Sequence, residues 1–408
     1  MALIVQKFGG SSVADRERIF HVARIIAGTF NEGHRVVAVV SAQGDTTDEL
    51  LEKAEGISTR PAVRELDMLL ATGEQISIAL LCMALGELGI RAVSLTGWQA
   101  GFHTDRQHTR ARIRRLDTER IRSELDKNQV VVVAGFQGLD SCGNITTLGR
   151  GGSDTSAAAL ACALGAQRCC IYTDVDGVYT ADPRIVPMAH KLEQISFDEM
   201  LELAGVGAQV LHGRSVEMAR RWGVPLEVLS SIQPGSGTLV TEVCSMEGMQ
   251  IKSVAVQKNV SVLFVAAAQH SLQPLLAALN AQSIPVKQVL QCTAGEGQLQ
   301  AQLLLEDTAA QQAKAALEAR FDTLRLQKLN VSDDIACLSL VGSGLGEDAG
   351  ALPQLLASLS DIGLYPRLVT AGEVRISVII DRSAAADAVR CVHAAFFESD
   401  NEKNIGEK

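Results

Sequence analysis

The feature that most constrains the fold is an alternation of short apolar, β-branched runs with segments of helical period in the first half of the chain. The runs lie at residues 3–7, 36–41, 92–95, 130–134 and 170–173, and amphipathic or alanine-rich stretches separate them. Such alternation is typical of βαβ units. It predicts an α/β fold with an open, mainly parallel sheet and helices on both faces.

Clusters of glycine and hydroxyl residues follow the predicted strands. The clusters at 9–12, 43–47 and 135–138 come directly after the first, second and fourth runs. In open α/β sheets, ligands bind beyond the carboxyl ends of the strands. Because unrelated turns would have no reason to favour that edge, the pattern predicts a ligand site there.

The segment 147–155 (TLGRGGSDT) combines several requirements of anion binding. Its three glycines allow a close backbone approach to a ligand, and Ser153 or Asp154 is expected to cap the helix that follows. The helix N-terminus adds partial positive charge, and Arg150 supplies a forked cation suited to a carboxylate or phosphate. The alternative for this segment alone is an ordinary glycine turn before an amphipathic helix.

Two further strings suit a nucleotide. In 7–12 (KFGGSS) a lysine precedes two glycines and two hydroxyls, so the string predicts a phosphate cradle that differs from the Walker A loop. The string 172–184 (YTDVDGVYTADPR) offers acceptors, an aromatic ring and a terminal arginine that could hold a ribose, a base and phosphates.

Composition excludes some classes of protein. A chain of 408 residues that is 47% hydrophobic can bury a large core, and its length suggests roughly two to four domains. The net charge of −10 argues against nucleic-acid binding. Neither a signal-peptide core nor an apolar run long enough for a membrane span is evident, so we expect a cytoplasmic protein.

The pattern changes near residues 240–250, where the phosphate-type loops stop. Beyond this point two series of strand and helix signals follow one another, each consistent with a βαββαβ order. We therefore expect three domains: 1–245, 250–330 and 331–400. Two unrelated α+β stretches remain the alternative for the second half.

Taken together and in this order, the strings resemble the amino-acid kinase family, and the repeat resembles paired ACT domains, which have a ferredoxin-like βαββαβ fold. The resemblance covers the whole chain. It implies ATP-dependent phosphorylation, with Mg²⁺, of the side-chain carboxylate of L-aspartate to 4-phospho-L-aspartate, the first step toward lysine, threonine and methionine. Such a carboxylate is already ionised at neutral pH, so the mechanism requires no general base.

The resemblance also implies a set of site residues. The catalytic positions are Lys7, which contacts the transferring phosphates, and Asp154, which organises cationic groups. Glu74 matches the position that binds the substrate ammonium, and Arg150 one that binds a carboxylate; without the resemblance, Glu74 could be a solvent-facing helix charge. The other acceptor-binding positions are Ser41, Thr47 and Ser153. The other nucleotide-binding positions are Gly9, Gly10, Ser11, Thr173, Asp174, Tyr179, Asp182 and Arg184. No residue is assigned as a dedicated metal ligand, and no metal role is expected for His103 or His108, which are expected in a solvated loop.

The chain departs from the family pattern in two places. Gln209 stands where the family usually has a phosphate-binding lysine, so low activity is expected. The effector loops of the first ACT-like copy are eroded at 267–272 and 284–286, which predicts weak or absent inhibition by lysine plus threonine. The alternatives are an amino-acid-binding regulatory subunit with a weakened kinase domain, or a kinase for another carboxylate acceptor.

ACT units usually bury strand edges by pairing. We therefore expect a homodimer through the ACT-like domains. The small-molecule partners that the resemblance implies are L-aspartate and ATP. A shorter subunit that starts at Met246 or Met249 is a further hypothesis.

Overall fold

A computed structural model describes residues 1–208, 210–233, 235–242, 250–268, 271–294 and 298–398. The chain forms two compact units. The first comprises Met1–Tyr179 and His190–Glu247, and the second comprises Thr180–Ala189 and Gly248–Lys408. The short segment Thr180–Ala189 therefore belongs to the second unit although it lies inside the sequence of the first.

The first unit is built on an eight-stranded sheet with the order β10-β12-β11-β9-β1-β2-β6-β3. All neighbouring strands are parallel except β11 and β12, which are antiparallel. The predicted open, mainly parallel sheet is thus confirmed. Its strands are β1 (Leu3–Phe8), β2 (Arg35–Val40), β3 (Ala92–Leu95), β6 (Val130–Ala134), β9 (Arg168–Thr173), β10 (Gln194–Ser196), β11 (Leu226–Ser230) and β12 (Thr238–Thr241).

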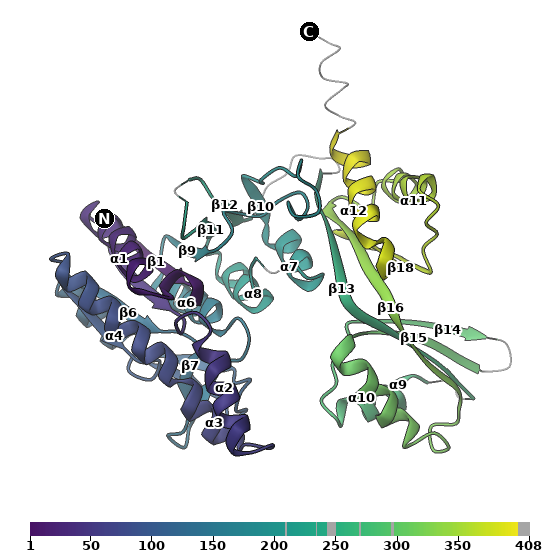
Figure 1. Cartoon of the computed structure of the whole chain (residues 1–408), viewed down its shortest axis with the longest axis horizontal. Coiled ribbons are helices and arrows are strands. Elements are labelled where there is room, and N and C mark those ends of the chain that lie inside the picture. The colour runs from purple at the N-terminus through teal and green to yellow at the C-terminus, as the bar shows by residue number, and fades with distance from the viewer. Residues whose placement is uncertain (209, 234, 243–249, 269–270, 295–297, 399–408) are drawn as a thin grey trace, which may run out of the picture. The chain divides into compact units, whose positions relative to one another are not determined.

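Helices cover both faces of this sheet (Figure 1). On one face, α1 (Arg16–Asn31) and α4 (Thr72–Glu87) form a core with alternate residues of the central strands, such as Val36, Ala38 and Val40. The residues between them, such as Val37 and Val39, are equally buried, and α6 (Gly152–Leu164) packs against β1, β2 and β9. Burial on both faces explains why the strands are continuous apolar runs.

The remaining elements of the first unit surround this core. A four-stranded sheet has the order β5-β4-β7-β8. Its strands are β4 (Phe102–Thr104), β5 (Ile113–Leu116), β7 (Gln137–Leu139) and β8 (Ile145–Thr147). The other helices are η1 (Gly10–Val13), α2 (Thr46–Ile57), α3 (Val63–Leu70), α5 (Glu119–Asp126), α7 (Phe197–Gly205) and α8 (Gly213–Trp222).

One sequence expectation about membranes needs correction. Helices α3 and α4 form a stretch of 25 residues, Val63–Glu87, whose most apolar 18-residue window has a mean hydropathy of 1.7, so it is long and apolar enough to cross a membrane by length and composition. Half of its most apolar window is buried, and α4 packs against α1, β3 and β6. This packing accounts for the buried residues of the stretch, such as Ile78, Leu81 and Leu85, whereas Ile76, Leu80 and Met83 are exposed.

The second unit contains a six-stranded antiparallel sheet with the order β14-β15-β13-β16-β18-β17. In Figure 1, α9 and α10 lie beside one end of the long strands β13 and β16, and α11 and α12 lie beside the other end. The strands are β13 (Gln250–Ala267), β14 (Gln288–Ala294), β15 (Gln298–Glu306), β16 (Leu326–Ser343), β17 (Leu368–Ala371) and β18 (Arg375–Asp381). The helices are α9 (Gln273–Asn280), α10 (Asp307–Glu318), α11 (Ala351–Asp361) and α12 (Ala385–His393), followed by short helical turns.

The two ACT-like copies are nested, and do not follow one another as the sequence predicted. The second half of β13 pairs with β15 and with the first half of β16, which completes the first copy. The first half of β13, residues 250–257, pairs instead with the end of β16, which also pairs with β18. Because β13 and β16 each run through both copies, the last strand of the second copy comes from residues that precede the first copy.

The segment Thr180–Ala189 is built into the second copy. Ala181 and Val186 belong to the apolar core formed by β16, β18, α11 and α12. The carbonyl of Thr180 accepts from the amide of Val254 at 2.8 Å, and its hydroxyl lies 2.9 Å from Nε2 of the buried His393. These contacts explain why contiguous sequence does not define the units.

Candidate active site

The strand register brings the predicted loops together. Phe8 is paired with Val40 on one side and with Tyr172 on the other, and Val40 is paired with Ala134. Strands β1, β2, β6 and β9 therefore end at the same level of the sheet. The glycine clusters that follow them, together with the N-terminus of α6, lie at this one edge, as the sequence predicted.

The loop after β1 comes close to its neighbours. The amide of Gly9 donates to the carbonyl of Tyr172 at 3.3 Å, and the rings of Phe8 and Tyr172 stack with centroids 4.7 Å apart. A Cβ added at Gly10 would lie 2.7 Å from the carbonyl oxygen of Ala42. Glycine is needed at position 10 because the two loops touch through their backbones, and Ser11 next to it is exposed.

This contact leads to a first prediction. Gly10→Ala should lower the thermal unfolding temperature by an amount equivalent to about 1–3 kcal/mol, because the new methyl group must displace backbone. Gly28→Ala is the matched control, since a Cβ there has no neighbour within 4 Å. Equal melting temperatures for the two variants in thermal unfolding would contradict the expectation.

Lys7 and Asp154 form a largely buried ion pair. Lys7 Nζ lies 2.7 Å from Asp154 Oδ1, and the two side chains are 11% and 14% exposed. Lys7 lies one residue before the end of β1, and Asp154 lies in the first turn of α6, where the helix dipole favours an anion. The two predicted catalytic residues are thus in direct contact.

The Arg150 loop enters α6 through left-handed backbone. Gly149 and Gly151 have φ values of 77° and 65°, which favour glycine. Gly151 is the N-cap, and α6 has no side-chain cap, so the predicted capping by Ser153 or Asp154 is wrong. Ser153 is instead buried against Gly135. A Cβ added at Gly135 would lie 2.8 Å from the Cβ of Ser153. The side chain of Arg150 is exposed.

Glu74 is a buried carboxylate. It lies in the first turn of α4 and is 3% exposed, which excludes the alternative of a solvent-facing charge. Its Oε1 accepts from the amide of Ala42 at 3.1 Å, and its buried Oε2 has no hydrogen-bond partner among the residues that the structure describes. Burial raises the pKa of Glu74 to about 7, although hydrogen bonds from backbone amides and from the side chain of Gln137 act in the opposite direction.

Ser41 and Thr47 flank the same loop. Ser41 follows β2 directly, and its amide donates to the carbonyl of Phe8 at 3.1 Å. Thr47 lies in the first turn of α2, and both residues are half-buried. The loop that bears the predicted acceptor hydroxyls also carries the Ala42 amide that binds Glu74.

The predicted nucleotide loop is divided between the two units. Thr173 ends β9 and donates to Asp174 at 3.0 Å, and the hydroxyl of Tyr179 donates to Asp176 at 2.9 Å. Asp182 and Arg184, which pair at 2.8 Å, belong to the second unit. Contact of these two residues with a nucleotide remains a prediction.

Sequence reasoning missed several supporting residues. Asp67, buried in α3, accepts hydrogen bonds from two loops, and His108 Nδ1 lies 2.7 Å from its Oδ2. The expectation of a solvated loop around His108 is therefore wrong. His212 packs on Gly151, where an added Cβ would lie 2.2 Å from its ring, and burial lowers the pKa of its imidazole. An isolated acid or histidine has no sequence pattern that announces such contacts.

Comparison with known proteins shows which family the chain belongs to. The model of the amino acid kinase family matches residues 2–230, and an ACT domain model matches residues 338–396. An aspartokinase of Geobacillus stearothermophilus is 46% identical over 406 residues, which are 97% of each chain, and aspartokinase 2 of Bacillus subtilis is 44% identical over 97% of this chain and 98% of that protein. The chain belongs to the aspartokinase family.

Solved aspartokinase structures agree with the fold. Aspartokinase III of E. coli in complex with aspartate and ADP superposes with a TM-score of 0.82 at 25% identity, covering 97% of this chain and all of that one. The form of the same enzyme with lysine and aspartate gives a TM-score of 0.74 at 26% identity, with 97% and 99% coverage. In this chain, Lys7 and the buried carboxyl group of Glu74 lie at the same edge of the sheet.

Proposed function

We propose that this protein phosphorylates the side-chain carboxylate of L-aspartate with ATP, which yields 4-phospho-L-aspartate. The observation that carries the proposal is Glu74, a buried carboxylate whose Oε2 has no hydrogen-bond partner among the described residues. A buried acceptor without a partner is costly unless a ligand satisfies it. The ammonium group of an amino acid supplies the donors and the charge that this oxygen lacks.

The acceptor carboxylates require cations. Arg150 is exposed at the edge where the loops meet, and its forked guanidinium suits a carboxylate. Together with Glu74 it gives one anion and one cation for a zwitterionic acceptor. Ser41, Thr47 and Ser153 then provide hydroxyl groups around the substrate.

Phosphoryl transfer in this site depends on positioning and charge neutralisation. The aspartate side chain is an ionised nucleophile at neutral pH, so no residue needs to remove a proton. Lys7 and the amides of the Gly9-Gly10 loop bind the phosphates, and Asp154 holds Lys7 in place through their 2.7 Å contact. Thr173, Asp174 and Tyr179 contact the rest of the nucleotide in this proposal, with Asp182 and Arg184.

Mg²⁺ is proposed as the companion of ATP. The described residues contain no cluster of three His, Cys, Asp or Glu side chains that could hold a metal ion. An ion bound mainly by nucleotide phosphates needs only one or two protein carboxylates, for which Asp154 and the exposed Asp174 are suitable donors. The ion would neutralise charge on the phosphates.

The test is a hydroxylamine-trapping assay with Mg-ATP and L-aspartate, with L-glutamate and no acceptor as controls. Hydroxamate that depends on aspartate supports the proposal. ATP binding without product would favour the regulatory-subunit alternative, and product with glutamate alone would favour a different acceptor.

Gln209 lies outside the described residues, so Gln209→Lys should be assayed in parallel. We expect this substitution to raise the turnover rate.

Regulation gives the second prediction. In the second ACT-like copy the amide of Gly342 donates to Val374 and that of Leu345 to Glu373, so the glycine loop closes onto the start of β18. In the first copy Gln269 and His270, part of the eroded loop, lie outside the described residues. We expect millimolar lysine plus threonine to leave most activity in the trapping assay. Complete inhibition at micromolar concentrations would show that the first copy retains an effector site.

We also propose a cytoplasmic homodimer formed through the ACT-like units. The exposed edges of a six-stranded sheet favour pairing. The hypothetical start sites Met246 and Met249 lie outside the described residues. Light scattering on the purified full chain, with electrophoresis for a second, shorter polypeptide, tests both ideas.

A further inference from the structure

Asp67 joins two loops to one helix. The residue is fully buried in α3, and three donors converge on its carboxylate. Thr147 Oγ1 donates to Oδ1 at 2.6 Å, the Thr109 amide donates at 3.0 and 3.1 Å, and His108 Nδ1 lies 2.7 Å from Oδ2. A buried carboxylate with this many donors is strongly held, and so are the groups that bind it.

One loop leads to Arg150, and the other contacts the residue before it. Thr147 ends β8, three residues before Arg150. Thr109 has a φ of 65°, and its carbonyl oxygen lies 2.9 Å from the position that a Cβ at Gly149 would occupy. The Arg150 loop therefore rests on backbone that Asp67 holds.

Other contacts strengthen this link. The amide of Ala111 donates to the carbonyl of Thr147 at 2.9 Å. Arg214 donates to the carbonyl of Leu148 at 2.6 Å and to that of Ala111 at 3.1 Å. Several hydrogen bonds thus join the two loops to each other, and Asp67 bonds both of them to α3.

Glu74 lies on the same helical stretch, Val63–Glu87, as Asp67. Seven residues separate the two carboxylates in sequence, and only Ala71 lies between α3, which carries Asp67, and α4, whose first turn carries Glu74. Asp67 therefore sets the place of the Arg150 loop relative to Glu74. These are the proposed binding groups for the carboxylate and the ammonium of the acceptor.

We propose that Asp67 is a positioning residue that fixes the spacing between Arg150 and Glu74 and so selects an acceptor of the length of aspartate over the longer glutamate. The proposal rests on the proposed function. Asp67 itself touches neither substrate. Its effect passes through Thr109 and Thr147.

The test compares Asp67→Asn, Thr147→Val and Thr147→Ser in the full-length protein. For Asp67→Asn and Thr147→Val we expect the KM for aspartate to rise about tenfold and the KM for ATP to change less than about twofold, since only acceptor placement is disturbed. The ratio of kcat/KM for aspartate over glutamate should fall. Thr147→Ser keeps the hydroxyl and should behave like the unaltered protein.

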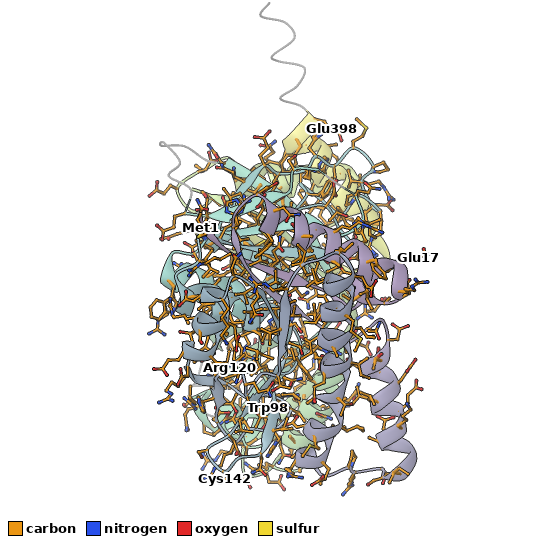
Figure 2. The ribbon with its side chains drawn as sticks, turned by 90° about the vertical axis from the view of Figure 1, so that its left-hand side faces the viewer. Met1, Glu17, Trp98, Arg120, Cys142 and Glu398 are labelled. Atoms are coloured by element: carbon orange, nitrogen blue, oxygen red, sulfur yellow. The ribbon has the colours of Figure 1, made fainter. Side chains whose placement is uncertain are left out.

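Asp140→Asn is the matched control. Asp140 is also buried and accepts backbone amides, from Cys142 and Asn144 at 2.8 Å each, but within the β7–β8 turn. In Figure 2, Cys142 in that turn lies at the end of the first unit away from Met1. This variant should lose stability and keep both KM values.

Hydrogen–deuterium exchange provides a readout that needs no turnover. In Asp67→Asn the amides of residues 107–111 and 147–152 should exchange faster, whereas Asp140→Asn should leave them unchanged. If Asp67→Asn does not fold, the comparison of Thr147→Val with Thr147→Ser tests the proposal on its own. Equal effects on both KM values, or an unchanged acceptor preference in Thr147→Val, would overturn the proposal. Absence of aspartate turnover in the unaltered protein would instead overturn the proposed function.

Discussion

Lys7→Met should lower kcat for aspartate phosphorylation by about 1,000-fold, because it removes a fixed positive charge from the transferring phosphates. The side chain is placed for this role by β1 and by its 2.7 Å contact with Asp154. Methionine has a similar aliphatic length and lacks the ammonium group, and with it the charge and three N–H donors. The measurement is steady-state kinetics with saturating aspartate and Mg-ATP.

The same substitution leaves Asp154 without its cation, so part of any loss could come from instability. The double variant Lys7→Met/Asp154→Asn removes the orphaned carboxylate and should recover the melting temperature but not kcat. Lys127→Met is the control, since Lys127 pairs with Glu124 at 2.7 Å while 58% exposed, and surface pairs contribute less than about 1 kcal/mol. Retention of more than a tenth of kcat in Lys7→Met would remove Lys7 from the catalytic residues.

Glu74→Gln should raise the KM for aspartate about 100-fold and leave the KM for ATP nearly unchanged, because the substrate ammonium loses its buried counter-ion. The pH dependence gives an independent signature. Since burial raises the pKa of Glu74 to about 7, most of the free enzyme is protonated there at pH 6 and ionised at pH 8. Aspartate binding requires the ionised form, so its KM should fall about tenfold from pH 6 to pH 8. In Glu74→Gln this contribution should vanish.

The free energy of unfolding should fall as the pH rises, whereas the affinity for aspartate should increase. The carboxyl group keeps its proton up to about pH 7 in the folded state and loses it near its ordinary value of 4.5 when unfolded. Between these values the folded state binds more protons, so stability falls as pH rises, by up to about 3 kcal/mol. Glu74→Gln should remove this loss and melt higher than the unaltered protein at pH 8. Glu65→Gln, at an exposed position of α3, should change neither property. A Glu74→Gln variant with unchanged aspartate KM would contradict the assigned role.

The parallel sheet and the loop edge could be predicted from sequence because their signals are local. The buried strands β2 and β6 each contain an apolar run of five residues, and β1 opens on three apolar residues; the cluster after each strand needs no distant partner to be recognised. Glu74 could be placed only through the family resemblance. By itself, a glutamate in a first helical turn is more often solvent-facing, and the buried position depends on Ala42.

The features that sequence did not predict depend on contacts between distant residues. Asp67 meets Thr147 across 80 positions of sequence, and a lone aspartate in a helix gives no sign of such a partner. The division of β13 between two ACT-like copies follows from its register with β16, which has shifts at Gln257/Val260 and Val260/Val262. The strand pattern continues through these irregularities, so no sequence boundary marks them.

Because the strands are nested, the two ACT-like copies can close only in a fixed order during synthesis. A chain emerging from the ribosome presents residues 250–257 first, but their partner, the end of β16, is made only after the rest of the first copy, and β18, which pairs with the end of β16, follows later still. The first copy can close as soon as residues 326–332 are available, whereas the second stays open until α12 has been added. Because Thr180–Ala189 packs into that second copy, a segment from within the sequence of the first unit reaches its final environment only after α12 has been made.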